Sequence, residues 1–132
     1  MRCPRPRNQI MTLEEFEQIV DDTVTGLPEQ FRERIENLAI VVEEWPDPWT
    51  LNAAHVHHRA QLLGFYHGVP LTARPHDYGN MTPDKISIYR QPIILYYRTR
   101  DAIREGIRHT VLHELAHYFG ISDDRLMEIG AY

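Results

Sequence analysis

Residues 113–124, which read HELAHYFGISDD, constrain this chain more than any other stretch. On an α-helix, His113 and His117 lie about 40° apart around the axis, with Glu114 about 100° from the first histidine. All three side chains therefore share one side of the helix. Two imidazoles so placed can grip a divalent metal while the carboxylate holds a water beside it. The spacing predicts the first half of a hydrolytic metal site.

The residues after the second histidine predict the other half. Gly120 can end the helix in a left-handed conformation and turn the chain back towards the metal. Asp123, six residues beyond His117, is then placed to supply a third ligand. Asp124 remains an alternative, because the geometry of a helix-turn cannot be fixed to one residue from sequence.

A further histidine, His109, extends the row along the helix. The rise from His109 to His117 is about 12 Å, which is too long for both to grip one ion easily. We therefore expect a supporting or structural role for His109. In a shuffled chain with the same 8 histidines, about 0.04 H-E-x-x-H matches would occur by chance, so a purely structural helix is the weaker interpretation.

Length and composition limit the remaining possibilities. The 132 residues are expected to form a single domain, 1–132, in which residues 1–10 are a flexible tail. A net charge of −5 gives no electrostatic footprint for nucleic acid. No apolar run is long enough for a membrane span or a secretory signal, and the lone Cys3 fits a reducing compartment. We expect a cytoplasmic protein with no membrane or nucleic-acid partner.

The first half of the chain predicts two helices and a strand. Apolar residues at helical spacing over 11–24 follow a capping box formed by Thr12 and Glu15. A second helix is expected over 28–37, opened by its proline. The β-branched run 38–42 then predicts a buried strand.

The middle of the chain is rich in histidine and glycine. Residues 50–61 lack a cysteine or carboxylate at ligand spacing, which favours a solvated loop or short helix over a second metal site. The histidines of this segment are His55, His57 and His58. In residues 62–72, Gly64 and Gly68 predict a hairpin or bulged strand pair, with His67 exposed at the turn.

Residues 73–83 are loop by composition, and residues 85–97 alternate as a strand. Pro92 cannot donate to a sheet, so it is expected at a strand end, on an edge, or in a bend between extended segments. Asp101 is the expected N-cap of the last long helix. Since the second half of that helix is apolar on most sides, we expect it to be buried, with the motif side chains inside the protein.

A short terminal helix should follow the motif. Ser122 is its expected N-cap, and Gly130 is expected to end it. Met127 falls within this helix, where it is expected to be a core residue; a Met-turn below a metal site is the less favoured alternative.

The residues quoted so far resemble the small bacterial zincin-like metallopeptidases, which have a minimal zincin fold and the pattern HExxHxxGxxD. The resemblance covers most of the chain and is most specific over 107–130. It implies an α/β (α+β) fold in which a small twisted sheet packs on N-terminal helices and a C-terminal active-site helix. It also implies that an edge strand receives substrate as an added strand, and Lys85 to Tyr89 is the expected equivalent.

For the site, the resemblance implies a zinc ion between His113, His117 and Asp123, with Glu114 as the general base. The third position departs from the related metzincin pattern, which has histidine there. A second donor for the developing oxyanion is not assigned by the motif; Tyr89 and Tyr118 are the available guesses.

The function predicted is a zinc-dependent metallopeptidase acting on peptides or unfolded proteins. One alternative is metal-dependent hydrolysis of RNA, against which the acidic composition argues. Another is a binding module in which zinc only staples the domain, or a protein that needs a partner for activity. Structural zinc sites usually have four protein ligands, often cysteines, and the only cysteine is far from the motif, so an open coordination position is favoured.

Overall fold

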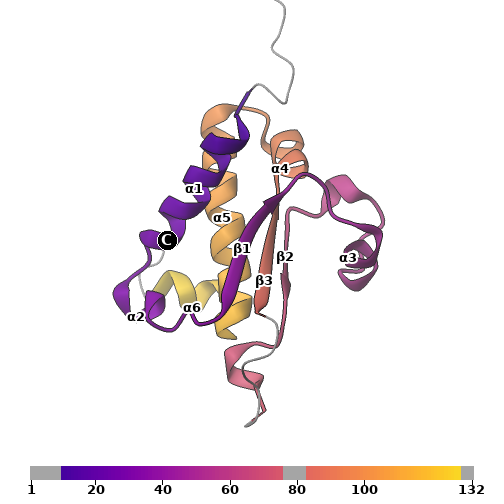
Figure 1. Ribbon diagram of the computed structural model, residues 1–132. Helices are drawn as coiled ribbons and strands as arrows, with labels where there is room; N and C mark the ends of the chain where they lie inside the picture. The colour runs from indigo at the N-terminus through magenta and orange to yellow at the C-terminus, as the bar shows by residue number, and fades with distance from the viewer. Residues whose placement is uncertain (1–9, 76–82, 129–132) are drawn as a thin grey trace, which may run out of the picture.

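The computed structural model describes residues 10–75 and 83–128 as a mixed α/β arrangement around a three-stranded sheet (Figure 1). The elements, in chain order, are α1 (Leu13–Thr25), α2 (Glu29–Arg32), β1 (Leu38–Glu43), α3 (Pro48–Ala53), η2 (Arg59–Gln61), β2 (Gly64–His67), η3 (Leu71–Ala73), β3 (Asp84–Tyr89), α4 (Arg90–Tyr97), α5 (Arg100–Phe119) and α6 (Asp123–Glu128). The mixed fold class is as predicted. The expected N-terminal tail, Cys3, most of the loop over 73–83 and Gly130 lie outside the described residues.

The sheet has the order β1-β3-β2, with β1 parallel and β2 antiparallel to β3. The central strand is therefore β3, and the prediction that Lys85 to Tyr89 forms an edge strand is wrong. The reason is burial on both faces: Ile86 and Ile88 are fully covered on one face, and Ser87 is fully covered on the other. A strand with both faces buried belongs in the middle of a sheet.

Helices α1 and α5 pack against each other on one face of the sheet, and α3 lies on the other side (Figure 1). The apolar side chains between these layers form one core. Its largest fully buried members include Phe16, Tyr118, Phe119, Met11, Ile88 and Ile107. Within the described residues, no helix has the length and apolar character needed to cross a membrane.

The start of α1 agrees with the predicted capping box of Thr12 and Glu15. The hydroxyl oxygen of Thr12 accepts a hydrogen bond from the backbone N–H of Glu15, at 3.2 Å. The Glu15 carboxylate accepts from the Thr12 hydroxyl and from Arg100 Nη2, at 3.3 and 2.6 Å, and interaction with the Thr12 backbone N–H also helps to lower its pKa. Glu15 therefore ties α1 to the start of α5.

Two predictions about the first half and the middle of the chain need correction. The helix expected over 28–37 is only α2, which ends at Arg32, and Asn37, with a left-handed φ of 52°, directly precedes β1. Residues 62–72 form no hairpin, since β2 pairs with β3 and the chain after Gly68 enters η3. The short helices α3 and η2 occupy much of 50–61, as one of the two predicted outcomes.

Local chemistry also explains the helices that lead to the motif. Pro92 is the third residue of α4, not part of a strand; the first N–H groups of a helix have no intrahelical partner, so its missing donor costs nothing there. Arg98, with φ 72°, separates α4 from α5. The N-cap of α5 is Thr99, whose hydroxyl accepts from Ala102 N at 3.2 Å, and the prediction of Asp101 is wrong by two positions.

Candidate metal centre

The C-terminal half of α5 brings together His113, Glu114 and His117. One ligand atom from each lies within 4.8 Å of the others, and this is the only such group of three or more among the described residues. The two imidazole rings meet edge to face, with centroids 4.6 Å apart. The helical spacing therefore produces the predicted cluster.

The burial of this cluster differs from the expectation. Glu114 is only 5% exposed, but the side chains of His113 and His117 are 41% and 52% exposed. The apolar residues of this half of α5 do pack into the core, and the glutamate points inward with them. The histidines instead lie at the border between helix and solvent, where an ion can reach them.

Glu114 also interacts directly with the second histidine. Its Oε1 lies 3.3 Å from Nδ1 of His117. This hydrogen bond raises the pKa of His117, because the carboxylate favours the protonated ring more than partial burial disfavours it. A metal that binds this imidazole competes with the additional proton of the charged ring, so metal binding is favoured as pH rises.

The turn after α5 is as predicted. Gly120 has φ 74° and ψ 32°, and its N–H bonds back to carbonyls of the last helical turn. A Cβ on Gly120 would collide with the Thr72 hydroxyl of η3, so glycine is required here by both conformation and space. Ser122 then accepts a hydrogen bond from Arg125 N, at 3.1 Å, and caps α6 as expected.

The turn delivers Asp123 to the first histidine. Oδ2 of Asp123 lies 2.7 Å from Nδ1 of His113, although the carboxylate is outside the tight group of three. This position is compatible with a metal ligand, and equally with a carboxylate that orients His113 by accepting its Nδ1 proton. Asp124 is exposed. Met127 is 57% exposed, so the expectation of a core residue there is wrong.

A small cleft lies between β2 and α5 beside the cluster, with a volume of about 250 Å³. Its lining residues are Leu63, Gly64, His109, Thr110, His113 and Glu114. A Cβ at Gly64 would lie 2.7 Å from Thr110 Cγ2 and 3.2 Å from Glu114 Cγ. Glycine therefore lets β2 approach the helix at the glutamate. The sequence signalled Gly64 only as a turn residue.

The outer edge of β2 borders this cleft, and no strand of residues 10–75 and 83–128 pairs with it. Tyr89 N donates to Leu63 O at 2.9 Å, which fixes the antiparallel hydrogen-bonding pattern. By alternation, the backbone groups of Gly64 and Tyr66 point away from β3. This edge, and not the central strand β3, is available for an added strand.

A buried network supports the turn from the opposite side. Tyr66 donates to Asp84 Oδ2 at 2.6 Å, and Arg74 forms an ion pair with the same carboxylate. Arg74 Nε also donates to Val69 O at 3.0 Å. Because these bonds flank η3, they hold Thr72 against the turn that carries the aspartate.

Neither tyrosine guessed as an oxyanion donor has that position. The Tyr118 hydroxyl accepts from Glu36 N at 3.0 Å and contacts Glu36 O at 3.1 Å, in the interior. Tyr89 is also buried, and by strand alternation it faces the side of the sheet opposite Ile88 and α5. Both hydroxyls hold the fold together.

The fold and site define a class: a mixed α/β protein whose long helix brings together a histidine pair and a glutamate in the arrangement of a metallohydrolase site. A family model described as zincin-like metallopeptidase matches residues 35–131, and the chain belongs to that family. A comparison with curated proteins found no match. Membership agrees with the resemblance seen in the motif.

Proposed function

We propose that this protein is a zinc-dependent peptidase that cleaves extended segments of peptides or unfolded proteins. The observation that carries the proposal is the close approach of ligand atoms from His113, Glu114 and His117, on the helix matched by a zincin-like metallopeptidase family. The reaction and the substrate class are inferred from this arrangement.

The donor set fits zinc. Two imidazoles and nearby carboxylates, without cysteine, are typical of catalytic rather than structural zinc sites. We propose His113, His117 and Asp123 as the ligands, since Asp123 already touches the first histidine. When bound, zinc supplies a Lewis acid that polarises the scissile carbonyl and makes water more acidic.

Glu114 is proposed as the general base. Its carboxylate is held by burial and by contact with His117, and Gly64 leaves space for β2 beside it. In this role it accepts a proton from the attacking water and returns it to the departing amine. Because Glu114 is partly desolvated, the local dielectric is low, and its interactions with the attacking water and the departing amine are stronger.

The outer edge of β2 is proposed to align the substrate. Gly64 and Tyr66 can offer backbone donors and acceptors to an extended chain beside the cleft. A folded protein rarely presents an unpaired strand, whereas a peptide or an unfolded protein does. We therefore propose unfolded polypeptide as the substrate class.

The test measures metal content and proteolysis in the same samples. Wild type should hold about one zinc per chain and cleave a labelled unfolded protein. Glu114→Gln should keep the metal and lose at least about 100-fold in rate, since a general base contributes 10²–10⁴-fold. Asp123→Ala should weaken metal binding, with the exposed neighbour Asp124→Ala as the matched control.

Three results would count against the proposal. If Asp123→Ala retains the metal and Asp124→Ala loses it, Asp124 and not Asp123 is the third ligand. Unchanged proteolysis by Glu114→Gln would remove the proposed base. Zinc binding without cleavage of any unfolded protein, with cleavage of RNA instead, would replace peptidase activity by phosphodiester hydrolysis.

A further inference from the structure

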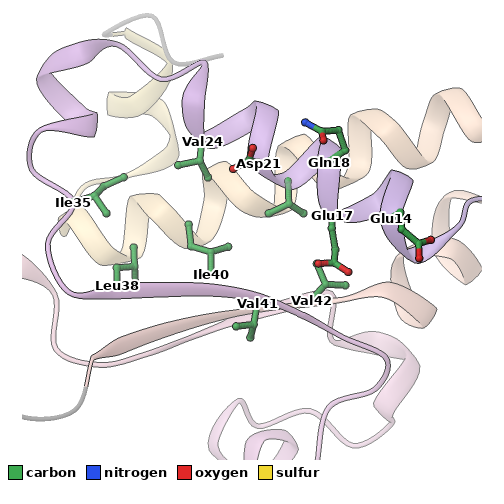
Figure 2. Close-up of a pocket in the computed structure, with 11 residues that line it drawn as sticks. Glu14, Glu17, Gln18, Asp21, Val24, Ile35, Leu38, Ile40, Val41 and Val42 are labelled. Carbon is green, nitrogen blue, oxygen red and sulfur yellow. The ribbon is translucent and has the colours of Figure 1, made fainter.

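A groove of about 780 Å³ runs between α1 and β1, on the opposite edge of the sheet from the metal centre (Figure 2). Its floor is aliphatic and only partly buried. Figure 2 shows Leu38 and Ile40 rising from β1 on the side facing Val24, while Val41 points to the opposite face of the sheet. The groove therefore exposes apolar surface along an edge strand.

The backbone of β1 is unpaired along this groove. Asp84 N donates to Asn37 O at 3.0 Å, which fixes which residues of β1 bond to β3. By the alternation of a parallel ladder, the N–H and C=O groups of Leu38, Ile40 and Val42 point outward. Within residues 10–75 and 83–128, no strand pairs with that edge.

The facing wall of the groove is acidic. Glu14, Glu17 and Asp21 occupy positions i, i+3 and i+7 of α1, so they form one row along the helix. All three are exposed, and within the described part of the chain none of their carboxylates has an ion pair or hydrogen bond. Figure 2 shows the Glu17 side chain directed towards β1 near Val42.

We propose that this groove binds an extended, lysine- or arginine-bearing segment of another protein as a fourth strand on β1. The main chain of that segment bonds to the outward groups of Leu38, Ile40 and Val42. Every second side chain then faces α1. The rise from Glu17 to Asp21 is about 6 Å, close to the roughly 6.7 Å between alternate residues of a strand, so alternating basic residues match the acidic row.

The charge of the groove favours a basic segment of another protein over a second copy of this chain. Antiparallel pairing of two β1 strands would place both α1 helices on the same face of the joined sheet. Two rows of Glu14, Glu17 and Asp21 would then approach each other across the symmetry axis, in a protein of net charge −5. Like charges at an interface disfavour association, whereas a basic segment neutralises the row.

The probe is a labelled nine-residue peptide in which lysine and valine alternate, added to the Glu114→Gln protein so that it is not cleaved. Fluorescence anisotropy should show saturable binding that weakens with added salt. A valine–glutamate peptide of equal length should bind at least about tenfold more weakly, as should a valine–lysine peptide with N-methylated amides on one edge.

The variant Glu17→Lys/Asp21→Lys should lose at least about tenfold in affinity for the basic peptide. Asp101→Lys/Glu105→Lys, an equal charge change at exposed positions of α5 away from the groove, should bind as before. Circular dichroism of both proteins checks that the fold is retained.

Amide hydrogen exchange then locates the added strand. In the complex, the outward N–H groups of Leu38, Ile40 and Val42 should become protected. Protection at Gly64 and Tyr66 instead would place the peptide at β2 and overturn the proposal. Three other results would also overturn it. Equal binding of the acidic peptide would indicate nonspecific contact, and a dimer that is lost in Ile40→Lys would indicate self-pairing. Peptide binding only after deletion of residues 1–9 would indicate that the chain's own arginines occupy the groove.

Discussion

The two outer edges of the sheet are built for different neighbours. At β2, glycine allows the strand to lie close to α5, and the adjacent cleft ends at a buried glutamate and two histidines. At β1, aliphatic side chains and an acidic helix leave a larger groove, and among the described residues no potential metal-binding cluster lies there. The outer edge of β2 places backbone groups beside the candidate metal site, and the outer edge of β1 places them beside acidic side chains.

The difference shows how one residue type changes the use of an edge strand. Gly64 has no side chain between β2 and Glu114, so a polypeptide on that edge lies next to the candidate base. The corresponding inner face of β1 carries Leu38, Ile40 and Val42, which hold α1 away from the strand. An edge strand offers backbone hydrogen-bonding groups to any added strand, and its side chains determine which other elements lie beside that added strand.

The largest expected effect comes from removing a proposed metal ligand on the β2 side of the sheet. His117→Ala should reduce bound zinc from about one ion per chain to less than about one-tenth, because it removes one of three proposed protein ligands. Mass spectrometry under native conditions checks the ratio. His109→Ala is the matched control on the same helix, and loss of zinc there would contradict the supporting role given to that residue.

A second prediction gives β2 the kind of side chain that β1 has. Gly64→Val should destabilise the protein by about 1–3 kcal/mol, since its side chain would overlap Thr110 and Glu114. Urea unfolding measures the change. Ile40→Val, on the half-buried β1, should cost no more than about 1 kcal/mol.

A double substitution tests whether overlap with Thr110 causes the loss of stability in Gly64→Val. If overlap is the cause, Thr110→Ala should recover part of the stability lost in Gly64→Val, because it removes the Cγ2 atom that lies closest. Strict additivity of the two substitutions would mean that β2 is not held close to α5 at this point.

A third prediction concerns the turn that serves only the β2 side. Gly120→Ala should cost about 1–2 kcal/mol, because a side chain disfavours the left-handed conformation, and it would also displace Thr72. The expected functional result is weaker zinc binding through movement of Asp123. Calorimetry of zinc binding to the folded variant tests this, and unchanged affinity would separate the turn from the metal centre.

The smallest expected effect lies at the end of β2. Burial lowers the pKa of His67 below its ordinary value of 6.5, and the Lys85 ammonium lowers it further. As pH falls below 6.5, the unfolded chain takes up this proton before the folded chain does, so the contribution of His67 to stability declines with acidification. Above 6.5 both states are neutral and the contribution is constant.

Unfolding measured between pH 5 and 7.5 checks this sign. His67→Phe should flatten the part of the pH dependence that comes from this ring, and His57→Phe, at an exposed position, is the matched control. An NMR titration of His67 with a pKa above 6.5 would reverse the argument.

The parts that sequence predicted are those that local spacing decides. The cluster on α5 follows from a four-residue repeat, the Gly120 turn from the needs of a left-handed residue, and the start of α1 from Thr12. Each depends on neighbours within one or two helical turns.

The parts that sequence missed depend on residues far apart in the chain. The central place of β3 is decided by pairing with β1 and β2, and the role of Gly64 by Thr110 and Glu114, which come more than forty residues later. Pro92 looked like a strand breaker because its alternating neighbours resemble a strand, yet its place in the first turn of α4 removes the conflict. Tertiary packing, which has no local signature, made each of these choices.

The pairing of α1 with α5 has a consequence for how the chain folds during synthesis. Phe16 and Val20 on α1 are buried in the finished protein by a layer that includes α5, which begins roughly eighty residues later. At about 5–20 residues per second, the ribosome takes several seconds or more to make that distance. During this interval the first helix has an uncovered apolar stripe, and a chaperone that binds nascent chains would meet it before its own partner helix exists.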